Sequence, residues 1–114
     1  VDSLAGYWDG SKEFVDTVNK VTELNRENRV KIEAPLLVMS KAEIILEGIK
    51  LGVIFRDTWT CYSDREDGVA DATTPSSSMR IKGFIDAGYE DPIIYLQQGK
   101  INKLYNENNC EICA

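Results

Sequence analysis

Histidine is absent from this chain of 114 residues. Histidine is the commonest general base and metal ligand near neutral pH, and it activates serine and cysteine nucleophiles. Its absence excludes Ser-His and Cys-His nucleophilic pairs among these residues. Any chemistry on this chain must therefore use carboxylates, lysines, backbone amides or a bound nucleotide.

Cysteines and long apolar runs are also scarce. The three cysteines are an odd number and no export signal precedes them, so we expect no disulfide framework. Cys110 and Cys113 have the spacing of half a metal site or a redox pair, but without a second pair we favour a tail with no chemistry. No apolar run reaches the length of a transmembrane helix. We therefore expect a soluble, cytoplasmic protein that does not bind a membrane.

Basic residues are fewer than acidic ones. Lys and Arg number 13 against 19 Asp and Glu, a formal net charge of -6. A nucleic-acid-binding surface needs clustered Lys and Arg to neutralise phosphates, so we expect no direct nucleic-acid contact. Hydrophobic residues make up 43% of the chain and are spread along it, which indicates one globular domain at most. The chain begins at Val1 rather than at a methionine, and we expect it to be a piece of a longer protein.

The spacing of apolar residues predicts three helices. Apolar positions recur every three or four residues over 11–25 and again over 78–88, the pattern of a helix with one buried face. Between them, Ser40 and Glu43 form the capping box of a third helix, which ends at Gly52.

Short strands are predicted around these helices. Apolar and charged residues alternate over 30–34, and an aromatic, β-branched stretch over 58–61 has the character of a strand end. Residues 93–96 are expected to form an edge strand, and 97–114 are polar enough to be a frayed or partner-bound tail.

The stretch from Thr58 to Pro92 carries the most specific pattern in the chain. Its distinctive residues are Trp59, Cys61, Tyr62, Arg80, Lys82, Gly83, Phe84, Ala87, Gly88, Asp91 and Pro92. In order and spacing these residues resemble the C-terminal segment of the 7-cyano-7-deazaguanine synthases, which are PP-loop ATPase-type ligases of queuosine and archaeosine precursor synthesis. In that family a Trp-Ser/Thr-Cys-Tyr strand end precedes a loop of cysteines, an Arg-x-Lys-Gly-Phe helix and a Gly-x-x-Asp-Pro close.

The metal ligands of the family are not kept. The family's three loop thiolates correspond to positions 71, 74 and 77, which are Asp71, Thr74 and Ser77 here, and Cys61 corresponds to the remaining ligand. One thiolate, one carboxylate and two hydroxyls are a poor zinc site, since structural zinc takes four thiolate or imidazole ligands. The loop is either a degenerate metal loop or an ordinary polar surface loop. Cys61 is a surviving ligand or, as we favour, a small buried apolar residue.

Two further segments resemble the same proteins. Gly6, Tyr7 and Asp9 match a Ser-Gly-Tyr-x-Asp-Cys-Arg segment that contributes to the substrate pocket, although the arginine of that segment is absent here. Tyr7 would offer a stacking face and Asp9 an acceptor for a purine-like edge. The alternative is a helix-entry turn capped by Asp9 or Ser11.

The second segment is Pro-Leu-x-x-x-Ser-Lys-x-Glu-Ile, a pattern of many PP-loop enzymes that begins here at Pro35. It places Lys41 in the first turn of a helix, where a cation opposes the helix dipole unless an anion lies nearby. Lys41 is therefore our candidate catalytic residue facing a phosphate, and a solvated lysine is the alternative.

Arg80 and Lys82 are candidate substrate-binding residues, because they are basic side chains that follow the loop of an acidic protein. Surface salt bridges with Asp86 or Glu90 are the alternative.

The resemblance implies an α/β fold, the C-terminal portion of a PP-loop (adenine nucleotide alpha hydrolase-like) Rossmann-type fold. Residues 1–92 would be the C-terminal half of such a domain and 93–114 a polar tail. It also implies an enzyme, a homodimeric ligase that uses ATP and Mg²⁺ to convert 7-carboxy-7-deazaguanine and ammonia to 7-cyano-7-deazaguanine, with zinc doubtful here. The alternative is a non-catalytic binding or assembly module. The family's Ser-Gly-Gly-x-Asp-Ser phosphate loop is absent from these residues, so the chain alone is not expected to use ATP productively.

Overall fold

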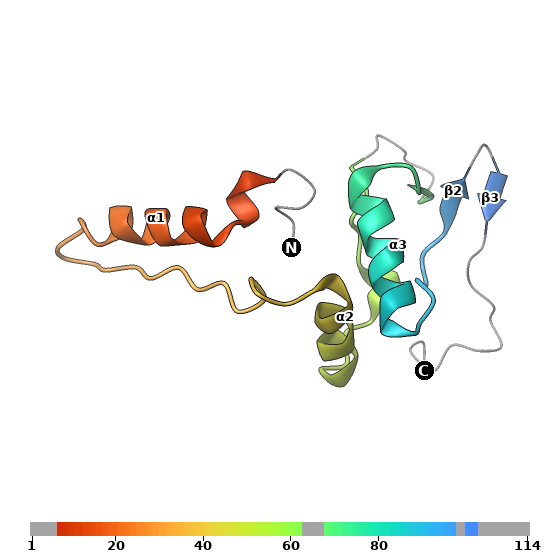
Figure 1. Cartoon of the computed structure of the whole chain (residues 1–114), viewed down its shortest axis with the longest axis horizontal. Coiled ribbons are helices and arrows are strands. Elements are labelled where there is room, and N and C mark those ends of the chain that lie inside the picture. The colour runs from red at the N-terminus through yellow and green to blue at the C-terminus, as the bar shows by residue number, and fades with distance from the viewer. Residues whose placement is uncertain (1–6, 63–67, 98–99, 103–114) are drawn as a thin grey trace. The chain divides into compact units, whose positions relative to one another are not determined.

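The computed structural model describes residues 7–62, 68–97 and 100–102 (Figure 1). Helices and short strands are mixed along these residues, as the sequence predicts. The elements are η2 (Trp8–Gly10), α1 (Lys12–Thr22), α2 (Lys41–Lys50), η3 (Phe55–Asp57), β1 (Ala70–Asp71), α3 (Pro75–Ala87), β2 (Tyr95–Gln97) and β3 (Lys100–Asn102). The chain forms two compact units, Val1–Met39 and Ser40–Ala114, which are described separately.

The first unit contains the predicted N-terminal helix, α1. Ser11 caps it, because its Oγ accepts a hydrogen bond of 3.1 Å from the backbone N–H of Phe14. The helix ends at Thr22, so residues 23–25 of the predicted range lie beyond it.

The strand predicted over residues 30–34 is wrong. Both backbone hydrogen-bonding groups of Ile32 are taken by one side chain, Asn19 of α1, whose Oδ1 accepts from Ile32 N at 2.8 Å and whose Nδ2 donates to Ile32 O at 3.0 Å. A backbone that is satisfied in this way has no groups left at that residue for a strand partner. The alternation also has no buried face, since Val30 and Ile32 are both exposed.

The second unit begins with α2, and its predicted capping box is confirmed. Ser40 Oγ accepts from Glu43 N at 3.2 Å, and Glu43 Oε2 accepts from Ser40 N at 2.7 Å. These bonds from the backbone and side chain of Ser40 lower the pKa of Glu43. Gly52 follows the helix with a φ of 75°, the left-handed conformation expected there.

The third predicted helix, α3, begins at Pro75 rather than at Ser78. Thr74 is its N-cap, and Pro75 occupies the first turn, where a missing N–H costs nothing. Gly88 ends the helix with a φ of 83°, as the sequence predicts.

Helices α2 and α3 pack closely because glycines lie at the contact (Figure 1). A Cβ on Gly83 would lie 2.5 Å from Lys41 Cγ and 3.1 Å from Ile45 Cδ1. A Cβ on Gly48 would lie 2.6 Å from the Phe55 ring. That ring in turn meets Phe84 edge to face, with centroids 5.2 Å apart. A larger side chain at Gly83 would separate α2 from α3, and one at Gly48 would displace the Phe55 ring.

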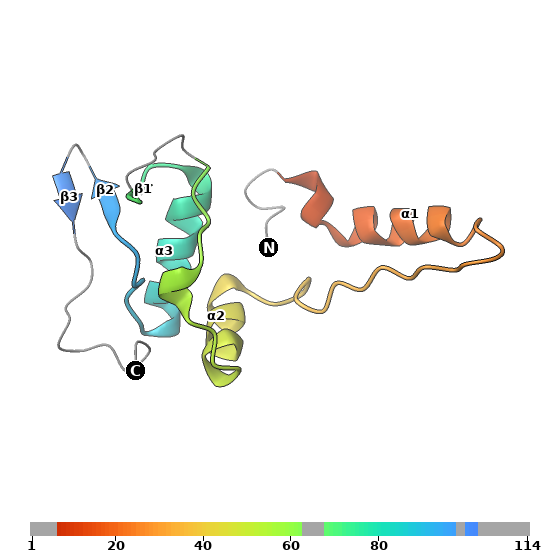
Figure 2. The same ribbon diagram turned by 180° about the vertical axis from the view of Figure 1, so that it is seen from behind.

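The sheet is small, with β2 at its centre (Figure 2). Strand β1 pairs parallel to β2, with Ala70 opposite Tyr95, and β3 pairs antiparallel to β2, with Ile101 opposite Leu96. The strand predicted over 93–96 is confirmed in part, since β2 covers Tyr95–Gln97. Its predicted edge position is wrong, because β3 comes from the segment interpreted as a polar tail and covers the outer edge of β2.

The strand end predicted over 58–61 is also wrong. Residues Thr58–Cys61 are extended but belong to no strand, and two of them, Thr58 and Thr60, accept hydrogen bonds from the side chain of Arg80. Cys61 itself is buried in an apolar cluster with Ala70, Ile93 and Tyr95.

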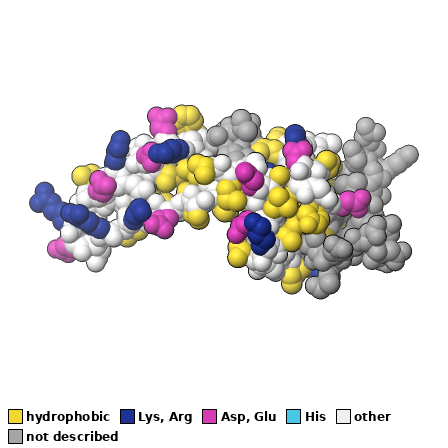
Figure 3. Space-filling view, turned by 60° about the horizontal axis from the view of Figure 1, so that its bottom comes forward, with side chains coloured by type: hydrophobic (Ala, Val, Ile, Leu, Met, Phe, Trp, Pro, Cys, Tyr) yellow, Lys and Arg dark blue, Asp and Glu magenta, His cyan; other side chains and the backbone are white. Residues whose placement is uncertain are grey.

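The surface carries hydrophobic side chains among charges of both signs (Figure 3). Leu51 and Ile85, for example, are 74% and 68% exposed. Among the described helices, none is both long and apolar enough to cross a membrane.

Replacing Gly83 by alanine tests the helix contact. We expect Gly83→Ala to lower the free energy of unfolding by about 1–2 kcal/mol, since overpacking outweighs the better helix propensity of alanine. Chemical unfolding of the full chain measures this, with Ile85→Ala on the exposed side of α3 as the control, expected to change it by no more than about 0.5 kcal/mol. Equal stability of Gly83→Ala and the unsubstituted chain would contradict the packing.

Candidate functional site

A buried pair of opposite charges lies in the second unit, at Arg80 in α3. Arg80 is 5% exposed, and Asp91, which follows the helix, is 3% exposed. Arg80 Nε lies 2.7 Å from Asp91 Oδ2, and Nη2 lies 2.9 Å from Asp91 Oδ1. The two side chains therefore form a buried, bidentate ion pair, the strongest geometry for an arginine and a carboxylate.

The remaining N–H groups of Arg80 donate to oxygen atoms of residues 55–60, the segment before Cys61. Nη1 donates to Thr58 O at 3.1 Å and Thr58 Oγ1 at 2.8 Å, and it lies 3.4 Å from Thr60 Oγ1. Nη2 donates to Phe55 O at 3.0 Å. Every N–H group of the guanidinium thus has an acceptor within the second unit. A substrate anion would have to displace Asp91 or these oxygens, so the geometry favours a structural role for Arg80.

Asp91 is shared by two further donors. Tyr95 donates its hydroxyl to Asp91 Oδ2 at 2.6 Å, and the backbone N–H of Ile93 lies 3.3 Å from Oδ1. The pKa of Tyr95 is raised, first by burial and then by its hydrogen bond to the Asp91 carboxylate, and the charge of Arg80 opposes this only in part. The neutral hydroxyl of Tyr95 is therefore part of the ion-pair network.

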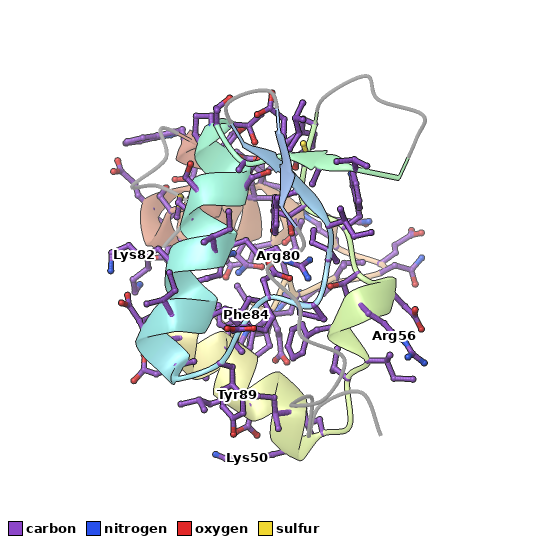
Figure 4. The ribbon with its side chains drawn as sticks, turned by 90° about the vertical axis from the view of Figure 1, so that its right-hand side faces the viewer. Lys50, Arg56, Arg80, Lys82, Phe84 and Tyr89 are labelled. Atoms are coloured by element: carbon purple, nitrogen blue, oxygen red, sulfur yellow. The ribbon has the colours of Figure 1, made fainter. Side chains whose placement is uncertain are left out.

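Lys82 points away from this network (Figure 4). Its Nζ forms an exposed salt bridge with Asp86 one turn later in α3, one of the two partners that the sequence suggested. Such a pair holds the lysine weakly, because exposed ion pairs contribute little to stability. The predicted substrate contact of Lys82 stays a prediction.

The other predicted site residues are divided between the two units. Tyr7 and Asp9 lie in and beside η2 of the first unit, where both are exposed. Lys41 is the first residue of α2 in the second unit. Its side chain is half-buried, with the stem against Gly83. Their convergence in one site stays a prediction.

The four positions that correspond to the family's zinc ligands lie along one short path. Cys61 Sγ accepts from Asp71 N at 3.4 Å, and Asp71 Oδ1 accepts from Thr73 N at 2.8 Å. Thr74 Oγ1 donates to Ser77 Oγ at 2.8 Å. No group of three or more cysteine, aspartate or glutamate side chains suited to a metal occurs in the described part of the chain. These four side chains do not fit a structural zinc site, since two of them are hydroxyls that hydrogen-bond to each other.

The comparison with known proteins agrees with the sequence pattern. The profile of the queuosine biosynthesis protein QueC family matches residues 2–88, which is most of the chain. The chain belongs to the QueC family.

Curated relatives of this QueC-family chain are 7-cyano-7-deazaguanine synthases. The Citrifermentans bemidjiense protein is 38% identical over 80% of this chain and 43% of its own length. The Thermoplasma acidophilum protein is 36% identical over 90% of the chain and 44% of its own length, and the Aliarcobacter butzleri protein is 40% identical over 82% and 41%. The chain thus spans less than half the length of these relatives. No solved structure matches it.

Sequence reasoning missed the partners of Arg80. Asp91 was recognised only as part of a motif, and Thr58 and Tyr95 were not singled out. The spacing of the apolar residues placed Arg80 off the buried stripe of its helix, so it gave no signal that this arginine is buried and needs an acceptor such as Asp91.

The Tyr95 hydroxyl predicts a pH dependence. A pKa raised in the folded state contributes stability that is fully present below the ordinary value of 10.0 and is lost as the pH rises above it. We therefore expect the unfolding free energy to fall above about pH 10. In Tyr95→Phe, the unfolding free energy should fall less above this pH, because the titrating hydroxyl is gone. Urea unfolding at a series of pH values measures this. The same pH dependence of the unfolding free energy in both proteins would contradict the network.

Proposed function

We propose that this chain is the C-terminal part of an ATP-dependent carbon–nitrogen ligase that converts 7-carboxy-7-deazaguanine and ammonia to 7-cyano-7-deazaguanine. The similarity to 7-cyano-7-deazaguanine synthases along residues 2–88 carries the proposal. Under it the chain has a PP-loop, Rossmann-type fold, acts as a homodimer in the cytoplasm and serves tRNA modification by way of its product. The parallel pairing of β1 with β2 is compatible with such a fold.

The reaction needs the carboxylate activated twice. Transfer of an adenylyl group from ATP to the carboxylate releases pyrophosphate and makes the carboxylate oxygen a good leaving group, and ammonia displaces this oxygen as AMP to give the amide. A second ATP activates the amide oxygen with release of pyrophosphate, and this oxygen leaves with AMP as the nitrogen loses two protons and the nitrile forms. Both activations develop negative charge on phosphate oxygens, the first at a carboxylate and the second at an amide, so they benefit from fixed cations.

The residues of this chain contribute binding groups rather than the nucleotide site. Lys41, which the capping box holds at the start of α2, supplies a cation beside transferred phosphoryl or carboxylate oxygens. Tyr7 stacks on the deazapurine, Asp9 accepts hydrogen bonds from its amidine edge, and Lys82 contacts an anionic group. Arg80 holds the scaffold instead. ATP and Mg²⁺ require the phosphate loop of a longer polypeptide, because the sequence contains none.

A second candidate is a non-catalytic QueC-like module for binding or assembly. The hydroxyl side chains at positions 74 and 77 favour it, because the chain departs from its family there. An activity assay on the full polypeptide separates the two candidates, since only the ligase forms the nitrile from the acid, ammonia and ATP.

The role of Lys41 is tested in the same assay. We expect Lys41→Ala to lower kcat/KM by about 100-fold, because a preorganised charge is lost at the reacting oxygens. Lys50→Ala at the other end of α2, whose ammonium pairs with Glu47, is the matched control and should leave kcat/KM unchanged. Absence of product from the unsubstituted protein would contradict the ligase. If the unsubstituted protein forms product and Lys41→Ala has an unaltered kcat/KM, only the proposed role of Lys41 is contradicted.

A further inference from the structure

Four positions in and around the loop before α3 have the spacing that the resemblance assigns to a four-ligand metal site, and hydrogen bonds through side chains and the Asp71 backbone link them. We define the ligand positions as Cys61, Asp71, Thr74 and Ser77. Ser77 is 1% exposed and Cys61 is 6% exposed, so both are well inside the second unit.

Successive ligand positions are linked to each other. Cys61 Sγ accepts from the Asp71 backbone N–H at 3.4 Å. Thr74 Oγ1 lies 3.3 Å from Asp71 O and 2.8 Å from Ser77 Oγ. The chain of contacts therefore runs from position 61 through 71 and 74 to 77, the same four points that a tetrahedral metal would tie together.

Two of these side chains, those of Thr74 and Asp71, also perform a local structural task. Thr74 Oγ1 accepts from Ser77 N at 3.3 Å and so caps α3. Asp71 Oδ1 accepts from Thr73 N and from Thr73 Oγ1, at 2.8 and 2.6 Å, which closes a tight turn. In the described residues every buried side-chain N or O atom has a hydrogen-bond partner, so the buried hydroxyls here are satisfied without a metal ion.

We propose that this loop is closed without metal, by a hydroxyl and thiol hydrogen-bond network in place of the zinc that the family resemblance implies, and that the ligand positions remain close enough for three added thiolates to form a metal site. The proposal concerns the loop alone and is independent of the ligase activity.

The test uses the full chain with Cys110→Ser and Cys113→Ser, so that the C-terminal cysteine pair cannot take up metal. We expect this protein to carry no stoichiometric zinc and to keep its Tm when EDTA or Zn²⁺ is added. Stoichiometric zinc, with a Tm that EDTA lowers, would overturn the proposal.

A gain-of-site variant tests the convergence of the four positions. Asp71→Cys, Thr74→Cys and Ser77→Cys, combined in the same background and refolded with Co²⁺, should give the absorption of tetrahedral cobalt–thiolate coordination and a Tm that rises with Zn²⁺. A folded variant that takes up no Co²⁺ would show that the positions do not converge.

A single substitution tests the network without metal, whether or not the multiple variant folds. Thr74→Ala should lower Tm by about 4–8 °C, because it removes the cap and the bond to Ser77. Thr74→Ser keeps the hydroxyl and should restore most of the loss. An unchanged Tm for Thr74→Ala would overturn the network.

Discussion

The buried ion pair between Arg80 and Asp91 is the interaction on which the second unit depends. An arginine inside a protein is tolerated only when its donors are paired, and here the carboxylate and the oxygens of residues 55–60 pair all of them. The pair therefore joins three segments that are distant in the sequence: α3, the crossing chain before Cys61 and the chain that leads into β2. Tyr95 extends it to the sheet through its hydroxyl.

This arrangement gives a structural reason for several residues of the pattern by which residues 58–92 resemble the 7-cyano-7-deazaguanine synthases. Gly83 allows α2 to approach α3, Gly88 ends α3, and Asp91 receives the guanidinium. Each of these residues makes a contact that holds the second unit together. Similarity in this stretch is therefore evidence for the fold. The proposed substrate contacts depend instead on Lys41, Lys82, Tyr7 and Asp9.

Features that depend on local sequence could be predicted well. The capping box of α2, the left-handed Gly52 and Gly88, and the presence of the three helices follow from interactions within a few residues. The strands could not, because their pairing depends on distant partners: Asn19 occupies the backbone of Ile32, and β3 makes β2 central. Of the candidate site residues, Arg80 was placed on the correct helix, but its burial depends on Asp91 and Thr58, which a local pattern does not pair with it.

A double-mutant cycle on Arg80 and Asp91 tests this account most directly. Arg80→Met and Asp91→Asn, singly and together, are measured by urea unfolding of the full chain, with the exposed Lys82 and Asp86 pair as the control cycle. We expect each single change to cost about 3–5 kcal/mol and the double change to cost about 2–3 kcal/mol less than their sum. The control coupling should be about 0.5 kcal/mol or less. Additive losses at Arg80 and Asp91 would contradict the central role of the pair.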